Sequence, residues 1–186
     1  MDENSIMMEV VGGKTDRFGI LYERYKAPIY GYFFKLTSGD SQTSEDLSHN
    51  VFYKALKYKY SFKGTGTFAK WLFSIAHNLA IDHLKKKSRS VQRELSQKDL
   101  VEESNEQHVI QKNEELSILR EALKMLDFES RELIVLSKIK CLKYIEIADM
   151  LNCTEGAIKA RVFRALKKLR EVYVTLEMTY YERAGF

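Results

Sequence analysis

The chain has 186 residues, which is enough for one domain or for two small ones. Hydrophobic residues make up 45% of it and aromatic residues 12%, a composition that favours a packed core over wholesale disorder. One proline and nine glycines favour long helices over many short strands. The net charge is only +4, so where the charges lie is more informative than their sum.

The sequence carries no sign of export or of membrane insertion. No apolar run approaches the roughly 18 residues that a membrane span requires. The N-terminus holds acidic residues and lacks the apolar segment of a signal peptide. Cys141 and Cys153 do not make the disulfide framework of a small secreted protein. We therefore expect a cytoplasmic protein with no direct membrane insertion.

The first part of the chain shows helical spacing of its apolar residues. Large apolar side chains recur every three or four residues over 18–36, which predicts a helix that Pro28 breaks or kinks. A second helix is expected to open at Ser44, a capping residue followed by two acids that suit the positive end of a helix dipole. Its buried stripe is predicted to consist of Leu47, Val51, Phe52, Ala55 and Leu56.

A third helix is expected after a loop that contains two glycines, residues 62–66, and Thr67 is placed to cap this helix. The residues predicted to pack inward are Phe68, Trp71, Leu72, Ile75, Ala76 and Leu79. A different, polar face carries Lys70, Ser74, Asn78 and Lys85. The helix then runs into a basic cluster, 85–89.

Charge changes sign in the middle of the chain. Residues 85–93 contain five basic residues and no acid, whereas residues 94–115 contain seven acids, two lysines and no aromatic residue. The stretch 90–113 is therefore predicted to be a solvated linker. It separates a domain at 14–89 from a second domain at 114–176, and both are expected to be all-α.

The second half predicts helices near 115–126, 129–138, 143–151 and 155–175. The last two are separated by a short turn at Asn152, a residue that tolerates the left-handed conformation, and Thr154 can cap the final helix. That helix is expected to bury Ile158, Val162, Ala165, Leu166 and Leu169. A short helix, a tight turn and a longer basic helix are typical of a helix-turn-helix.

The final helix has the residue types that DNA recognition requires. Short or polar residues at its N-terminus can approach base edges, and cations further along can meet phosphates. The first group includes Thr154, Glu155 and Lys159, and the second includes Arg161, Arg164 and Lys168. Taken alone, the helix could also be an ordinary amphipathic helix with a solvated basic face.

Several segments together resemble one protein family. The segments 126–133, 144–148 and 154–170 resemble the fourth conserved region of bacterial sigma factors. The run SEDLSHNVF at 44–52 resembles the acidic helix with which that family binds the polymerase clamp, and WLFSIAHN at 71–78, followed by the basic cluster 85–89, resembles the helix that opens promoter DNA. The match is to the small extracytoplasmic-function branch of the sigma-70 family, which has only these two domains.

The resemblance implies a function, partners and site residues. It implies a protein that binds core RNA polymerase through clamp and flap-type contacts, directs it to promoter DNA in response to an envelope or extracellular signal, and is restrained by an anti-sigma factor wedged between the domains. The expected polymerase-binding residues are Glu45, Asp46, Leu47, Asn50 and Phe52. The expected DNA-binding residues of the first domain are Phe62, Lys63, Lys70, Ser74, Asn78, Lys85, Lys86 and Arg89.

The sequence departs from the family pattern at a few positions. His49 and Asn50 stand where glutamine and glutamate are common, which bears on the affinity for the clamp. Cys141 and Asn152 stand where glycine is usual, and Asp127 where proline is, which bears on turn geometry.

Two other classes of function account for the sequence less well. A helix-turn-helix regulator that acts without core polymerase would need neither the segment 44–52 nor the basic helix 68–89. An enzyme with a helical fold would need a convergent set of catalytic residues, but the four histidines lack ligand spacing and Gly64-Thr65-Gly66 lacks the lysine of a phosphate loop. We therefore expect no catalytic site, no metal and no cofactor.

Overall fold

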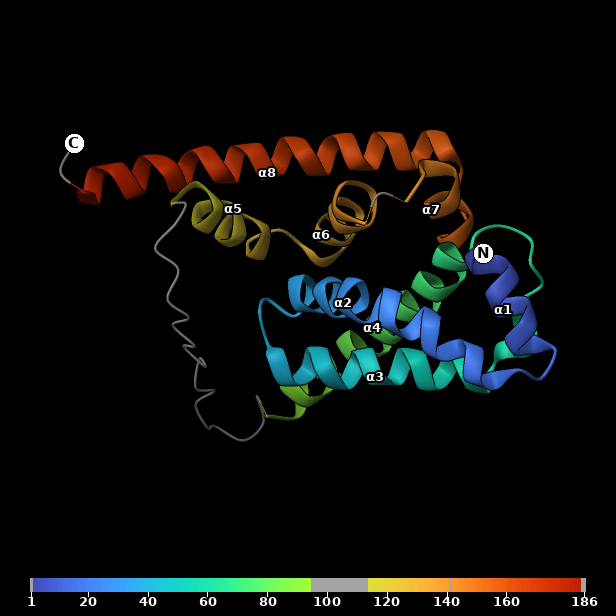
Figure 1. Cartoon of the computed structure of the whole chain (residues 1–186). Coiled ribbons are helices and arrows are strands. Elements are labelled where there is room, and N and C mark those ends of the chain that lie inside the picture. The colour runs from blue at the N-terminus through green and yellow to red at the C-terminus, as the bar shows by residue number, and fades with distance from the viewer. Residues whose placement is uncertain (1, 95–113, 141, 185–186) are drawn as a thin grey trace.

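The structure is a computed structural model that describes residues 2–94, 114–140 and 142–184, and in these residues it is helical with no strand (Figure 1). The predicted all-α class is confirmed. Most of the predicted linker, 90–113, lies outside the described residues and stays a prediction. The first half contains α1 (Glu3–Val11), α2 (Phe18–Leu36), α3 (Ser41–Lys57) and α4 (Phe68–Glu94), with 3-10 turns at Thr15–Arg17 and Lys59–Ser61.

The second half contains α5 (Glu114–Lys124), α6 (Phe128–Ile134) with a π-helical continuation (Val135–Ile139), α7 (Tyr144–Met150) and α8 (Glu155–Ala184). The helix α8 lies along one side of the molecule and runs past α5, and α6 lies between α8 and the helices of the first half (Figure 1).

The helix α2 runs through Pro28 without a break, and a kink at this proline stays a prediction. One local prediction for the first half was wrong. The helix α3 begins at Ser41, not at Ser44, because the Asp40 carboxylate accepts a hydrogen bond from the Thr43 backbone N–H at 2.9 Å and caps the helix one turn earlier. Ser44 is fully buried inside the helix, where its hydroxyl donates to the Asp40 carbonyl.

The helix-turn-helix has the predicted turn chemistry. Asn152 adopts the left-handed conformation, with φ of 51°, between α7 and α8. The Thr154 hydroxyl accepts a hydrogen bond from the Ala157 backbone N–H at 3.2 Å and so caps α8. The helix α8 continues to Ala184, beyond the predicted end near 175.

The first helix, α1, lies before the predicted start of the first domain at residue 14. Its apolar residues Ile6, Met7 and Val10 are buried in the same core as α2 and α4. The Asp2 carboxylate caps it by accepting the Asn4 backbone N–H at 2.6 Å. The N-terminal domain of the folded chain therefore includes α1.

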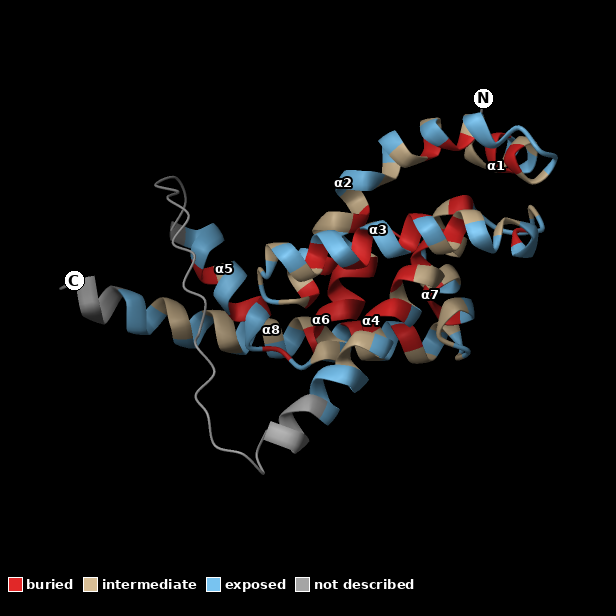
Figure 2. Cartoon of the chain, turned by 90° about the horizontal axis from the view of Figure 1, so that it is seen from below, coloured by how far each residue is buried: buried red, intermediate tan, exposed pale blue. Residues whose placement is uncertain are grey.

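The two halves share one hydrophobic core. Phe33 of α2 and Phe73 of α4 belong to the same buried cluster as Leu133, Leu136 and Ile147 of the second half. Figure 2 shows buried residues concentrated where α3, α4 and α6 come together. The halves are therefore packed against each other in this structure, in an arrangement that we call the closed arrangement.

A buried polar network joins the halves across this core. Glu132 of α6 is only 3% exposed, and its Oε1 accepts a hydrogen bond from the Tyr32 hydroxyl and lies 2.8 Å from His77 Nδ1. Burial, and then the charge of Glu132, raises the pKa of Tyr32 well above its usual value. The neighbouring Arg131 guanidinium donates to the Leu36 carbonyl at 3.2 Å. Two consecutive residues of α6 thus hold three residues of the first half, Tyr32, His77 and Leu36.

The network predicts a stability effect for Tyr32→Phe. Loss of the hydroxyl leaves the buried carboxylate of Glu132 with one hydrogen-bond donor fewer, so we expect the free energy of unfolding to fall by about 1–3 kcal/mol. Thermal unfolding measures this. Tyr30→Phe is the matched control, because Tyr30 is only partly buried on the other side of α2. Equal effects of the two substitutions would show that the buried network contributes nothing of its own.

A second prediction concerns pH. Lys140 lies against Gly31 of α2, and burial, together with the charge of Lys35, lowers the pKa of Lys140 from 10.5 to about 8. Between these two pH values the unfolded chain holds more protons on this lysine than the folded chain does, so the free energy of unfolding rises with pH. Below pH 8 both states are protonated and the cost of burying the ammonium is constant.

At pH values below 8, Lys140→Met should therefore raise the unfolding temperature by a few degrees. The variant should also lack the increase in unfolding temperature that the wild type shows between pH 8 and 10.5. Unfolding temperatures of both proteins across this window are the measurement. Parallel curves for wild type and variant would contradict the assignment to Lys140.

Candidate polymerase and nucleic-acid interface

The residues predicted to bind polymerase lie on α3 and divide by exposure. Glu45, Asp46 and Asn50 are exposed, whereas Leu47 and Phe52 are 8% and 6% exposed and belong to the core. The two apolar residues therefore fix α3 on the core, and the polar residues form the surface that a partner can touch.

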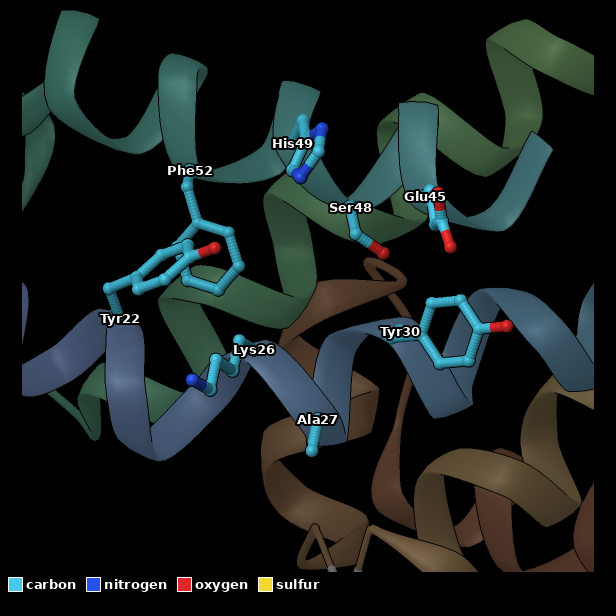
Figure 3. Close-up of a pocket in the computed structure, with 8 residues that line it drawn as sticks. All are labelled: Tyr22, Lys26, Ala27, Tyr30, Glu45, Ser48, His49 and Phe52. Carbon is cyan, nitrogen blue, oxygen red and sulfur yellow. The ribbon is translucent and has the colours of Figure 1, made fainter. Parts of the chain in front are cut away.

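A cleft opens beside this surface, between α2 and α3, with a volume of about 240 Å³ (Figure 3). The rings of Tyr22 and Phe52, 4.8 Å apart and edge to face, lie at one end, and Glu45 lies near Tyr30 at the other. Its lining residues are Tyr22, Lys26, Ala27, Tyr30, Glu45, Ser48, His49 and Phe52. The cleft thus offers apolar surface, a cation and an anion next to the exposed acids of α3.

The loop before α4, residues 62–67, holds the next predicted site residues. Phe62 is 3% exposed, and its ring packs edge to face against Trp71 at 5.4 Å and Phe68 at 6.1 Å. The Trp71 indole N–H donates to the Ser61 hydroxyl at 3.1 Å. Phe62 and Trp71 therefore support the loop from inside, and Lys63 is the loop's exposed cation.

The polar face of α4 is only partly open. Ser74 is half-buried and its hydroxyl donates to the Lys70 carbonyl at 2.9 Å. Lys70 forms an ion pair with Asp149 of α7. Asn78 is exposed, as are the cations toward the end of α4, which are Lys85, Lys86 and Arg89.

The loop contacts α7 as well. The Thr67 hydroxyl donates to Glu146 Oε1 at 2.5 Å, and it also accepts the Lys70 backbone N–H at 3.2 Å, which confirms the predicted cap. The closed arrangement therefore places the first helix of the helix-turn-helix over Thr67 and Lys70.

On α8, three of the predicted DNA contacts are paired within the second half. Lys159 Nζ lies 2.7 Å from Glu155, and Arg161 lies 3.1 Å from Glu129. Lys168 Nζ lies 2.8 Å from Asp127, and this contact, with the Ser130 N–H, lowers the pKa of Asp127 to about 2. Asp127 is half-exposed and Arg164 is exposed. These are surface pairs, worth little energy, that phosphates can replace.

The described residues contain no cluster of histidines, cysteines and acids that could hold a metal ion. Among the helices of the described part of the chain, none combines the length and the apolar character of a membrane span.

Comparison with known proteins identifies the family. The description "Sigma-70 region 2" matches residues 21–90, and "Sigma-70, region 4" matches residues 116–169, so the two regions together cover about two thirds of the chain. The chain is similar to the ECF RNA polymerase sigma factor BldN of Streptomyces coelicolor, with 31% identity over 90% of this chain and 66% of that protein. The chain belongs to the sigma-70 family.

Further relatives place it within the extracytoplasmic-function branch. The chain is 29% identical to the sigma factor SigX of Bacillus subtilis over 84% of this chain and 83% of that protein. It is 27% identical to the sigma-E factor of Escherichia coli over 89% of this chain and 91% of that protein. This sigma factor is thus a regulatory protein of transcription initiation.

Solved structures agree with this assignment. The chain superimposes on the sigma factor RpoE of Bartonella quintana, solved with the anti-sigma factor NepR, with a TM-score of 0.71, 26% identity and coverage of 83% of this chain and 95% of that chain. CnrH, solved with the cytosolic domain of CnrY, shares the fold with a TM-score of 0.68 at 22% identity, over 93% of this chain and 97% of that chain.

The sequence reasoning missed two features of this sigma factor. The first is α1, whose buried Ile6, Met7 and Val10 have helical spacing and follow the capping residue Asp2, so the signal was present. The second is the pair Glu132 and His77, two polar residues of separate halves whose contact no local pattern reveals.

Proposed function

We propose that this sigma factor binds core RNA polymerase through the exposed acids of α3 and promoter DNA through the loop 62–67, α4 and α8. The observation that carries the proposal is the separation of charge. Glu45 and Asp46 are exposed on α3, and the following residues, 47–81, contain five lysines and no acid. Acidic and basic residues thus occupy neighbouring but separate stretches of the chain. Such a charge distribution can bind a cationic protein surface and a nucleic acid side by side.

The DNA-facing groups have two roles. We assign strand opening to the loop 62–67 together with α4, and we call this loop the strand-opening loop. Lys63, Lys85, Lys86 and Arg89 are exposed cations that neutralise phosphates near it, and the exposed amide of Asn78 can hydrogen-bond an unpaired base. On α8, Thr154, Glu155 and Lys159 approach base edges, and Arg161, Arg164 and Lys168 meet phosphates.

The closed arrangement competes with promoter DNA. Lys70 and Thr67 contact Asp149 and Glu146 of α7, so DNA that contacts these two side chains has to displace their acidic partners. Exposed α3 acids remain open in the same arrangement. Polymerase can therefore engage α3 first, and separation of the halves then frees Thr67 and Lys70 from their partners on α7.

An anti-sigma factor is the restraining partner that we infer, by analogy with the solved RpoE–NepR complex. The direct contacts of Glu132 with Tyr32 and His77 mean that a partner wedged between the halves has to replace those contacts. Release of the partner by an envelope or extracellular signal then makes the chain active in the cytoplasm, where it acts without catalysis of its own. A regulator acting without core polymerase would have no use for the acidic surface of α3.

Charge reversal tests the polymerase surface. Glu45→Lys with Asp46→Lys should weaken binding to core polymerase roughly a hundredfold or more, because like charges then face each other. Co-purification and titration with core polymerase measure this. The control, Glu115→Lys with Glu121→Lys, reverses two exposed acids of α5 and should bind normally. Wild-type binding by the α3 variant would remove the basis of the proposal.

Two substitutions on α8 test the division of DNA contacts. Lys159→Ala should change discrimination between promoter variants by about 1–3 kcal/mol at one position of the distal element. Lys168→Ala should weaken binding to all variants alike. Binding isotherms on a panel of single-base promoter variants distinguish the two. Equal losses on every variant for both substitutions would contradict the assigned roles.

A further inference from the structure

The N-terminal helix α1 contacts the strand-opening loop through Asn4. The Asn4 side-chain amide donates to the Gly66 carbonyl at 2.7 Å, and its oxygen accepts the backbone N–H of Phe68 at 2.8 Å. One side chain therefore binds the Gly66 carbonyl of the loop and the Phe68 N–H at the start of α4. We propose that α1 positions the strand-opening loop for promoter melting and that Asn4 is the positioning residue, an inference that rests on the melting function proposed above.

The loop needs an external support. Gly64 and Gly66 have φ of 71° and 84°. Because glycine adopts many other backbone conformations as readily, holding it in this one costs conformational entropy. Within the loop and the start of α4, the supports include the buried ring of Phe62 and the cap at Thr67. A loop of this kind samples other conformations unless a neighbouring rigid element fixes its backbone.

The helix α1 is itself firmly anchored and so can serve as that element. Ile6, Met7 and Val10 are 1%, 0% and 0% exposed. Glu3 accepts a hydrogen bond from the Tyr25 hydroxyl at 2.6 Å, and the Tyr25 ring packs edge to face against Phe68, 5.2 Å away. Asn4 thus projects from a helix that is fixed to α2 and to the start of α4.

Two further contacts join α1 to the loop itself and to the segment just before it. The sulfur of Met8 lies 3.5 Å from the position that a Cβ on Gly64 would occupy. Lys59, just before the loop, donates to the Val10 carbonyl at 3.2 Å. Between Lys59 and Phe68 the chain therefore meets α1 at four residues, with hydrogen bonds to the backbone at Gly66 and Phe68.

The same helix forms a wall beside the loop. A cleft of about 400 Å³ opens there, with a lining made of Asp2, Glu3, Asn4, Arg24, Thr67 and Phe68. A protein that holds an unpaired base has to offset the free energy lost when the base unstacks. A preformed surface helps, because a mobile loop would cost additional entropy when it became ordered in the same step. The match to sigma-70 region 2 begins at residue 21 and does not include α1. The role proposed for α1 therefore rests on the contacts that this chain makes.

Asn4→Asp separates the two functions of the side chain. Aspartate keeps an oxygen to cap the Phe68 N–H but cannot donate to the Gly66 carbonyl. In the full-length chain we expect an unchanged unfolding temperature and unchanged binding to core polymerase. Hydrogen exchange of the backbone amides at 64–67 should rise, and permanganate reactivity of promoter thymines should fall roughly two- to tenfold, the effect of one lost hydrogen bond. On a promoter with the strands already unpaired, the defect should shrink.

Controls distinguish this inference from the function on which it rests. Ser5→Ala, which alters a neighbouring exposed residue of α1, should behave as wild type. Deletion of residues 63–66 should abolish melting, and wild-type melting by that deletion would overturn the proposed function and the inference together. If the deletion variant fails to melt the promoter but the Asn4→Asp variant melts it normally, the inference alone is wrong. Loss of polymerase binding or of folding by Asn4→Asp would show a structural role instead.

Discussion

The buried carboxylate of Glu132 ties the second half of this sigma factor to the first. It sits in a core that excludes water, where an uncompensated charge costs several kcal/mol, so its two partners have to be in place. Those partners, Tyr32 and His77, come from α2 and α4. Once they are engaged, α6 is fixed on the first half, and α7 follows it into contact with Thr67 and Lys70.

This constraint leaves one proposed binding surface free and pairs residues of another with acids of α7. The acids of α3 and the cations at the end of α4 face solvent, because nothing of the second half packs over them in the described residues. Thr67 and Lys70, at the start of α4, are paired with Glu146 and Asp149 of α7 at the same time. Under the proposed function the chain binds polymerase before DNA, and the contacts of Glu132 add to the shared hydrophobic core in holding the halves together.

Local chemistry made much of the fold predictable. Apolar spacing located the helices of both halves, and Asn152 and Thr154 marked the turn and the cap of the helix-turn-helix. The start of α3 was misplaced because Asp40 and Ser44 are both capping residues one turn apart, and the spacing of apolar residues does not choose between them. Phe62 carried a signal for a loop, but its burial depends on Phe68 and Trp71 closing over it.

The parts that sequence could not supply are contacts between distant residues. Glu132 follows a basic residue in a short helix and has the local signature of a surface acid. Its burial depends on Tyr32, a hundred residues earlier in the chain. Asn4 likewise gives no hint that its partners are at Gly66 and Phe68. Such pairs are fixed by how helices pack, and helical periodicity reports only which face of each helix is apolar.

The distance between the halves tests the central claim most directly. Fluorescent labels at Glu23 of α2 and Ile145 of α7, both exposed, can be introduced after Cys141 and Cys153 are replaced by serine. Energy transfer is then measured on the free chain, with core polymerase, and with promoter DNA added. The closed arrangement predicts one short distance for the free chain and a longer one in the complex with polymerase and promoter. A free chain that already shows the long distance would contradict it.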